Sequence, residues 1–191
     1  MRYFGKTGMK IKRVGFGGIP IQRISQEDTN KVIDELEKCG VNFIDTARGY
    51  TVSEEYLGNA LKGRREKFYI ATKSMSRDYE SMKRDIEISL KNLQTDYIDL
   101  YQMHNVKPAE YDTLFGEDKA YRALLEAKEQ GKIKHIGITS HGLETVEKAV
   151  ESDKFETIQF PYNIVENQAD EVFKRAYEKG VGTIVMKPLA G

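Results

Sequence analysis

The stretch Phe43-Ile44-Asp45-Thr46-Ala47-Arg48-Gly49-Tyr50 begins as an apolar, strand-like run and ends in polar residues. Two later stretches, Phe68-Tyr69-Ile70-Ala71-Thr72-Lys73 and Leu100-Tyr101-Gln102-Met103-His104, change in the same way. Parallel α/β proteins keep their active sites at the carboxyl ends of their strands. The three stretches therefore predict a parallel sheet whose polar residues gather at one end.

Apolar runs recur along the rest of the chain and are too continuous for half-exposed strands. We expect seven buried strands, near residues 13–17, 41–46, 67–72, 96–103, 133–139, 156–161 and 181–186. Stretches with helical spacing lie between them, as in Met82, Ile86, Leu90 and Leu93. Strand and helix thus alternate at roughly 25 to 35 residues per unit, which predicts right-handed βαβ crossovers and a parallel sheet.

The predicted helices carry end signals. Gly40, Gly131 and Gly180 each stand just after a helical stretch, where we expect the left-handed conformation of a C-terminal cap. Ser25 and Ser53 precede acidic residues and predict helix N-caps.

Two folds fit this alternation, a doubly wound sheet and a closed barrel. Candidate polar residues follow the second to the sixth predicted strands, whereas an open sheet concentrates its ligands at one switch point. The barrel is therefore favoured. Seven strands do not close it, and a typical (β/α)8 barrel needs about 250 residues. We expect one domain over residues 1–191, a TIM barrel that is C-terminally incomplete and lacks its last strand and helices.

Composition excludes several classes of partner. Lys plus Arg and Asp plus Glu number 30 each, so no net field favours nucleic acid or an anionic membrane. Cys39 is the only cysteine, which excludes an intrachain disulfide and a cysteine-rich metal site, and we expect it to pack inward. The chain shows neither a secretory leader nor an 18-residue apolar run. These features predict a cytoplasmic protein without a metal, and they leave its oligomeric state open.

Four ionisable residues at the strand ends form a proton-donating set: Asp45, Tyr50, Lys73 and His104. Tyrosine is a weak acid with a pKa of about 10, and we assign Tyr50 as the general acid toward a carbonyl oxygen. Lys73 is expected to lower the pKa of Tyr50 by stabilising its phenolate, and Asp45 to hold Lys73 in place. His104 would donate a hydrogen bond that orients the carbonyl. The set predicts an enzyme.

The proton-donating set and its surroundings resemble the aldo-keto reductase family. Asp45-Thr46-Ala47 with Tyr50, and then Leu57-Gly58, is similar to the family's Asp-Thr-Ala-x-x-Tyr signature and the helix after it. Lys73 and His104 fall where the family's other two catalytic residues belong. The resemblance runs from about residue 2 to Gly191 at the end of the chain. The first and last residues of the chain are similar to those of a bacterial branch of the family. That branch often adds a C-terminal iron–sulfur segment, although this chain lacks the cysteines to hold a cluster.

The resemblance implies a reaction and a cofactor. The reaction is hydride transfer from nicotinamide C4 to a small aldehyde or ketone, with Tyr50 as the proton donor. The resemblance implies that Ser140 and Gln159 hold the nicotinamide carboxamide and that the backbone of Gly17 and Gly18 borders the cofactor. NADPH is the cofactor implied, and NADH stays open because the family's phosphate-binding residues follow the eighth strand.

Two other functions fit parts of the pattern. Some relatives use the barrel as a nicotinamide-binding regulatory module that senses redox state, and the complete proton-donating set argues against this reading only weakly. A Schiff-base lyase would use Lys73 rather than Tyr50 as its reactive group. Pairing with Asp45 would make that amine a poor nucleophile, so we expect an NAD(P)H-dependent carbonyl reductase.

Overall fold

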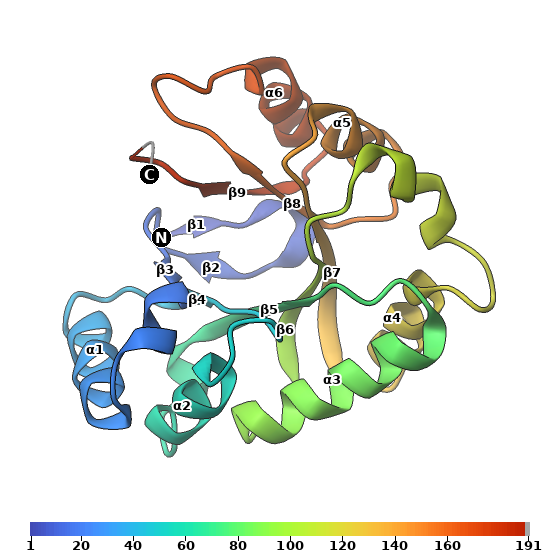
Figure 1. The fold of residues 1–191 in the computed structure, drawn as a ribbon. Coiled ribbons are helices and arrows are strands. Elements are labelled where there is room, and N and C mark those ends of the chain that lie inside the picture. The colour runs from blue at the N-terminus through green and yellow to red at the C-terminus, as the bar shows by residue number, and fades with distance from the viewer. Residues whose placement is uncertain (190–191) are drawn as a thin grey trace.

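A curled parallel sheet, covered on its outer face by helices, makes up most of the molecule (Figure 1). The structure is a computed structural model that describes residues 1–189, so the last two residues of the predicted domain over residues 1–191 lie outside the described residues. Seven strands follow one another in sequence order, β3-β4-β5-β6-β7-β8-β9. All six neighbouring pairs are parallel. The predicted fold class, a (β/α)8 barrel that is incomplete in this chain, is confirmed.

Six of the seven predicted strand ranges contain one strand of this sheet, and the range 67–72 overlaps β5, which runs on to Ser74. The strands are β3 (Phe16–Gly17), β4 (Phe43–Asp45), β5 (Tyr69–Ser74), β6 (Ile98–Met103), β7 (Ile133–Thr139), β8 (Thr157–Pro161) and β9 (Gly182–Met186). The helices are α1 (Gln26–Lys38), α2 (Ser53–Ala60), α3 (Tyr79–Leu93), α4 (Ala120–Glu129), α5 (Leu143–Glu151) and α6 (Asp170–Glu178). None of these helices is long and apolar enough to cross a membrane.

Strand side chains alternate between the two faces of the sheet, which explains the continuous apolar runs. Ile44, Ile70 and Tyr101 belong to the larger hydrophobic core, together with residues of the covering helices. Phe43 and Ala71, their neighbours in the sequence, belong to a smaller cluster on the inner face. The strands in the middle of the sheet are therefore buried on both sides.

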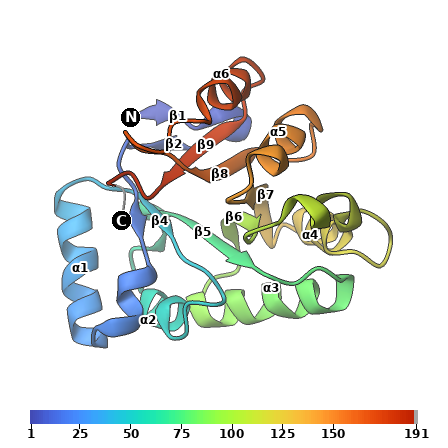
Figure 2. The same ribbon diagram turned by 45° about the horizontal axis from the view of Figure 1, so that its top comes forward.

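A hairpin of β1 (Arg2–Tyr3) and β2 (Lys10–Ile11) lies beside β9 and closes the amino end of the inner face (Figure 2). Phe4 packs edge-on against Phe43 with ring centroids 5.8 Å apart. Gly5 has a φ of 55°, and a Cβ there would lie 2.5 Å from the Gly180 oxygen, so only glycine fits. The carboxyl ends of the strands form the opposite end of this face.

The three glycines at the predicted helix ends adopt the expected left-handed conformation. Gly40, Gly131 and Gly180 have φ values of 67°, 75° and 68°. Each closes a Schellman motif; after α1, the Gly40 N–H donates to Glu37 O at 3.0 Å and the Val41 N–H donates to Leu36 O at 2.9 Å. These caps end α1, α4 and α6 shortly before β4, β7 and β9.

The expectations for residues near helix ends were right at Ser25 and wrong at Cys39 and Ser53. The Ser25 hydroxyl caps α1 by accepting from the Asp28 N–H at 3.1 Å. Cys39 is exposed, because it follows the last turn of α1 and the helix buries Ile33 instead. Ser53 is the first residue of α2 rather than its cap, and Val52 takes the cap position.

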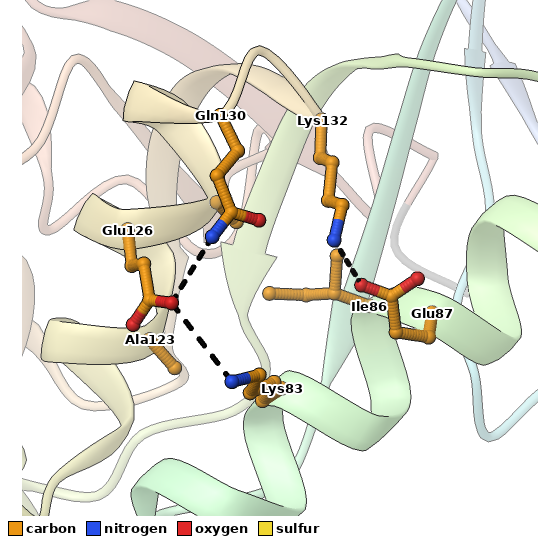
Figure 3. A pocket seen from close by; sticks show the side chains of 8 residues that line it. Lys83, Ile86, Glu87, Ala123, Glu126, Gln130 and Lys132 are labelled. Carbon is orange, nitrogen blue, oxygen red and sulfur yellow. Dashed lines mark hydrogen bonds and ion pairs between the residues drawn. The ribbon is translucent and has the colours of Figure 1, made fainter.

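A small crevice separates α3 from α4 on the helical layer outside the sheet (Figure 3). Lys132 Nζ lies 2.5 Å from Glu87 Oε1, and Lys83 Nζ lies 3.9 Å from Glu126 Oε1. Gln130 donates to the same Glu126 oxygen at 3.0 Å. The crevice is thus a helix contact whose charges are already paired.

Candidate active site

The inner face of the sheet becomes polar toward the carboxyl ends of the strands. Asp45 is the last residue of β4, Lys73 lies near the end of β5, and His104 follows β6 directly. In the ladder Lys73 pairs with Gln102, while Asp45 pairs with Ala71. The parallel register therefore brings residues from distant parts of the chain to one level.

Lys73 is the most deeply buried member of the proton-donating set, with 2% of its side chain exposed. Its ammonium donates to Asp45 Oδ2 at 2.6 Å and to the Thr46 carbonyl at 2.8 Å. The predicted pairing of Asp45 with Lys73 is present, and it holds the lysine against the end of β4.

Tyr50 reaches this pair from the loop after β4. The Tyr50 N–H donates to Ala47 O at 3.0 Å, which closes a turn that carries the ring over the strand ends. Lys73 Nζ lies 5.2 Å from the centroid of the Tyr50 ring. The ring also packs edge-on against His104, with centroids 6.0 Å apart and an interplanar angle of 85°. The structure thus brings the whole proton-donating set together.

The acidity of Tyr50 differs from the expectation. Burial, followed by the negative charge of Asp45, raises the pKa of Tyr50 to about 12, so the expected lowering by Lys73 was wrong. The physical reason is that the loss of water around the partly buried ring, together with the negative charge of Asp45, disfavours the phenolate more than Lys73 stabilises it. Tyr50 is consequently a neutral phenol at physiological pH.

His104 is also neutral at physiological pH. Burial, followed by the positive charges of Lys73 and Arg77, lowers the pKa of His104 to about 4. Among the described residues, its buried Nδ1 has no hydrogen-bond partner. Arg77 donates to the His104 carbonyl at 2.8 Å and so holds the loop after β6. A neutral imidazole keeps one N–H that can donate a hydrogen bond.

Two glutamines extend the polar layer across the inner face. Gln102 Nε2 donates to Asp45 Oδ1 at 3.1 Å and to Gln159 Oε1 at 3.3 Å. Gln159 Nε2 donates to Asp45 Oδ2 at 3.4 Å. The sequence reasoning identified Gln159 but missed Gln102. A signal for Gln102 was present, because it lies two residues before His104 and therefore on the same face of β6.

The predicted cofactor-binding residues lie at the same end of the sheet. Ser140 is fully buried; its hydroxyl donates to Val106 O at 2.6 Å and accepts from the Gly142 N–H at 2.9 Å. The Ser140 N–H donates to Gln159 O at 3.1 Å, which joins the ends of β7 and β8. Ser140 is therefore held firmly beside Gln159.

Gly17 and Gly18 lie at the end of β3, beside β4. The Gly18 N–H donates to Asp45 O at 2.7 Å. A Cβ on Gly18 would lie 3.0 Å from the Ser53 hydroxyl, whereas a Cβ on Gly17 would meet nothing within 4 Å. Gly17 thus exposes its backbone, and Gly18 is packed against the start of α2.

Comparisons with known proteins agree on one protein family. Residues 13–191 match a family model described as the aldo/keto reductase family. The chain is 29% identical to L-galactose dehydrogenase of Arabidopsis thaliana over 100% of this chain and 65% of that protein. It is 31% identical to the aldo-keto reductase YhdN of Bacillus subtilis over 86% of this chain and 54% of that protein. The chain therefore spans less than two thirds of the length of these two relatives.

A solved structure agrees with these matches. The holo form of an aldo-keto reductase from Bacillus halodurans superposes with a TM-score of 0.88 at 28% sequence identity. The superposition covers 99% of this chain and 66% of the other one. The curled sheet and its surrounding helices are thus similar to those of a longer reductase.

Proposed function

This chain belongs to the aldo/keto reductase family, and from that premise we propose that its protein reduces aldehydes or ketones to alcohols with NADPH or NADH. One observation supports the proposal above the others. Tyr50, a neutral phenol, lies against His104, and the ammonium of Lys73 lies 5.2 Å from its ring at the carboxyl ends of the strands. A carbonyl oxygen that gains negative charge needs a proton donor and a second hydrogen-bond donor, and these residues offer both.

The proposed chemistry gives each side chain one task. A bound reduced nicotinamide supplies a hydride from C4 to the carbonyl carbon. Tyr50 gives its phenolic proton to the carbonyl oxygen, which completes the alcohol, and the phenol later regains a proton from solvent. The neutral His104 donates a hydrogen bond to the same oxygen, while the Lys73 ammonium stabilises the phenolate that forms.

The residues present suit a nicotinamide carboxamide and its neighbouring groups. Gln159 offers an amide donor and an amide acceptor, the complement that a carboxamide requires. Ser140 has one lone pair beyond its two hydrogen bonds. We propose that Ser140 and Gln159 bind the carboxamide and that the backbone of Gly17 and Gly18 borders the cofactor. NADPH is the first cofactor to test, and NADH is the second.

The lyase reading loses support from the position of Lys73. Its side chain is 2% exposed and gives two hydrogen bonds, to Asp45 and to the Thr46 carbonyl. A Schiff-base lysine needs a free amine that can attack a carbonyl. We therefore assign Lys73 to charge stabilisation.

The test measures carbonyl reduction by the wild-type protein and a Tyr50→Phe variant. Loss of reduced-nicotinamide absorbance would be followed with a simple aldehyde, first with NADPH and then with NADH. Tyr50→Phe should slow reduction by roughly 10²- to 10⁴-fold, the usual contribution of a general acid. The matched control is Tyr177→Phe, because Tyr177 is 86% exposed on α6 and should not affect the rate.

Two results would overturn this proposal in different ways. A Tyr50→Phe variant with the wild-type rate would show that Tyr50 is not the acid. A wild-type protein that binds NADPH, seen by nicotinamide fluorescence, but reduces no carbonyl from a broad panel would instead favour a redox-sensing module.

A further inference from the structure

Glu54, the second residue of α2, is a fully buried carboxylate. Its Oε1 accepts from the Thr72 and Ser89 hydroxyls, at 2.7 Å each. Its Oε2 accepts from Arg48 Nη1 at 2.6 Å and from Asn92 Nδ2 at 3.3 Å. A buried charge needs an opposite charge and hydrogen bonds, and Arg48 is the cation among these four partners.

Arg48 lies in the turn that carries Tyr50, two residues away along the chain. The Arg48 N–H donates to Lys73 O at 2.9 Å, so the turn is hydrogen-bonded to β5 at the proposed catalytic lysine. The Arg48 side chain is 24% exposed, and its Nε lies 3.9 Å from Asp85 Oδ1. The turn is therefore held by its backbone to β5 and by the Arg48 side chain to α2, where the Ser53 N–H also donates to Tyr50 O at 2.8 Å.

Strand β5 links these contacts to the proton-donating set. Thr72 and Lys73 are neighbours, so their side chains leave the strand on opposite faces. Lys73 points inward to Asp45, and Thr72 points outward to Glu54. A shift of the Tyr50 turn relative to Lys73 would therefore separate Arg48 from Glu54.

We propose that the Arg48–Glu54 ion pair positions Tyr50 for proton transfer, so that both residues are positioning residues of the reaction. The inference rests on the proposed function only in its assignment of Tyr50 as the acid. The ion pair fixes the turn over the strand ends, and the turn fixes the phenol beside Lys73 and His104. Loss of either partner releases the turn and gives the phenol more access to water.

The test compares Arg48→Met and Glu54→Gln with a matched control at the other end of β5. Arg65→Met breaks a similar pair there, because Arg65 Nη2 lies 2.7 Å from Asp99 Oδ2 with side chains 14% and 11% exposed. Titration of Tyr50 is followed by NMR of a ¹³Cζ-tyrosine label, and Tyr50→Phe assigns the signal. Hydrogen exchange of the Arg48 and Tyr50 amides reports the turn itself. Neither readout needs turnover.

The expected result is a change confined to the variants of the ion pair. In Arg48→Met and Glu54→Gln, the pKa of Tyr50 falls from its raised value toward the ordinary tyrosine value, and both amides exchange faster. Arg65→Met leaves the two readouts as in the wild type. Arg48→Lys, which keeps the charge, shifts them less than Arg48→Met and in the same direction. In an active protein, kcat falls on the order of 100-fold, as for a misplaced catalytic group, while KM for the cofactor changes little.

Wild-type titration and exchange in Arg48→Met, Glu54→Gln and Arg48→Lys would overturn the proposal. An equal change in Arg65→Met would also overturn it, because the effect would then be a general loosening of the structure.

If Arg48→Met does not fold, Arg48→Lys and Thr72→Val decide by the same criteria. Thr72→Val removes one hydrogen bond to Glu54 and keeps the ion pair, so it should shift Tyr50 less than Glu54→Gln. Failure of the reductase proposal is a separate result, namely a wild-type protein that reduces no carbonyl.

Discussion

The ammonium of Lys73 lies 2.6 Å from the carboxylate of Asp45 on the inner face of the sheet, where the two side chains are 2% and 13% exposed. This buried pair joins β5 to β4 directly beneath the Tyr50 ring. Removing one partner of a buried pair typically costs 3–5 kcal/mol, because the other charge stays buried without compensation. The pair therefore ties the stability of the sheet to the geometry of the proposed active site.

The first prediction concerns this pair. Lys73→Met should lower the free energy of unfolding by about 3–5 kcal/mol, and Asp45→Asn/Lys73→Met should recover part of that loss because no unpaired charge is left. Urea denaturation of the single and double variants measures both effects. Lys31→Met is the control, because Lys31 is 62% exposed in its pair with Glu27 and should cost less than about 1 kcal/mol. Equal costs for Lys73→Met and Lys31→Met would contradict the prediction.

The second prediction concerns the stability of the chain at acid pH. The pKa of His104 is lowered to about 4 in the folded chain, whereas an unfolded histidine titrates near 6.5. Between these values the unfolded chain binds a proton that the folded chain does not, so stability falls as pH falls from about 6.5 to about 4. The difference in unfolding free energy between wild type and His104→Asn should change across this window and be constant above it. A difference that is constant down to pH 4, or a His104 NMR titration centred near 6.5, would count against it.

Much of the fold was predictable because the signals were local. Continuous apolar runs predicted strands buried on both faces, and Gly40 predicted a helix end because glycine is the residue that most readily takes the left-handed cap conformation. The position of Cys39 was not predictable, since helical spacing does not say which residue follows the last turn. The raised pKa of Tyr50 was also not predictable, because it depends on how far the ring is buried and on the nearby negative charge of Asp45.

The sequence placed the catalytic candidates better than their supporting contacts. Lys73 and His104 were predicted at the same end of the sheet because both stand at the carboxyl ends of parallel strands. From the sequence, Glu54 was expected to be an ordinary acidic residue in the first turn of a helix. In the structure it is fully buried. Its partners Thr72 and Ser89 come from β5 and α3, and no pattern in the sequence links side chains so far apart in the chain.

The third prediction concerns the contact between α2 and α3. A Cβ on Gly58 would lie 2.2 Å from the Asn92 carbonyl oxygen and 2.8 Å from the Leu93 carbonyl carbon. Gly58→Ala should therefore destabilise the protein by about 1–3 kcal/mol as overpacking does, even though alanine favours a helix by about 1 kcal/mol. Thermal unfolding measures this, with Gly49→Ala as the control because a Cβ there would meet nothing within 4 Å. A melting temperature for Gly58→Ala at or above that of wild type would refute the close packing.

The fourth prediction concerns Gln102, whose amide donates to both Asp45 and Gln159 from the inner face of β6. Gln102→Leu keeps a similar volume and removes both donors, so Asp45 and Gln159 each lose a buried hydrogen bond. The expected loss of stability is about 1–3 kcal/mol.

The same variant should also affect the cofactor site. Because Gln159 is then free to rotate, NADPH affinity should fall more than the rate of carbonyl reduction by the NADPH-bound protein. Fluorescence titration measures the affinity, and single-turnover reduction measures the rate. Gln130→Leu is the control, since Gln130 is exposed between α3 and α4 and its hydrogen bond is with Glu126. Unchanged NADPH affinity in a folded Gln102→Leu would separate Gln102 from the cofactor site and leave it a residue of the core.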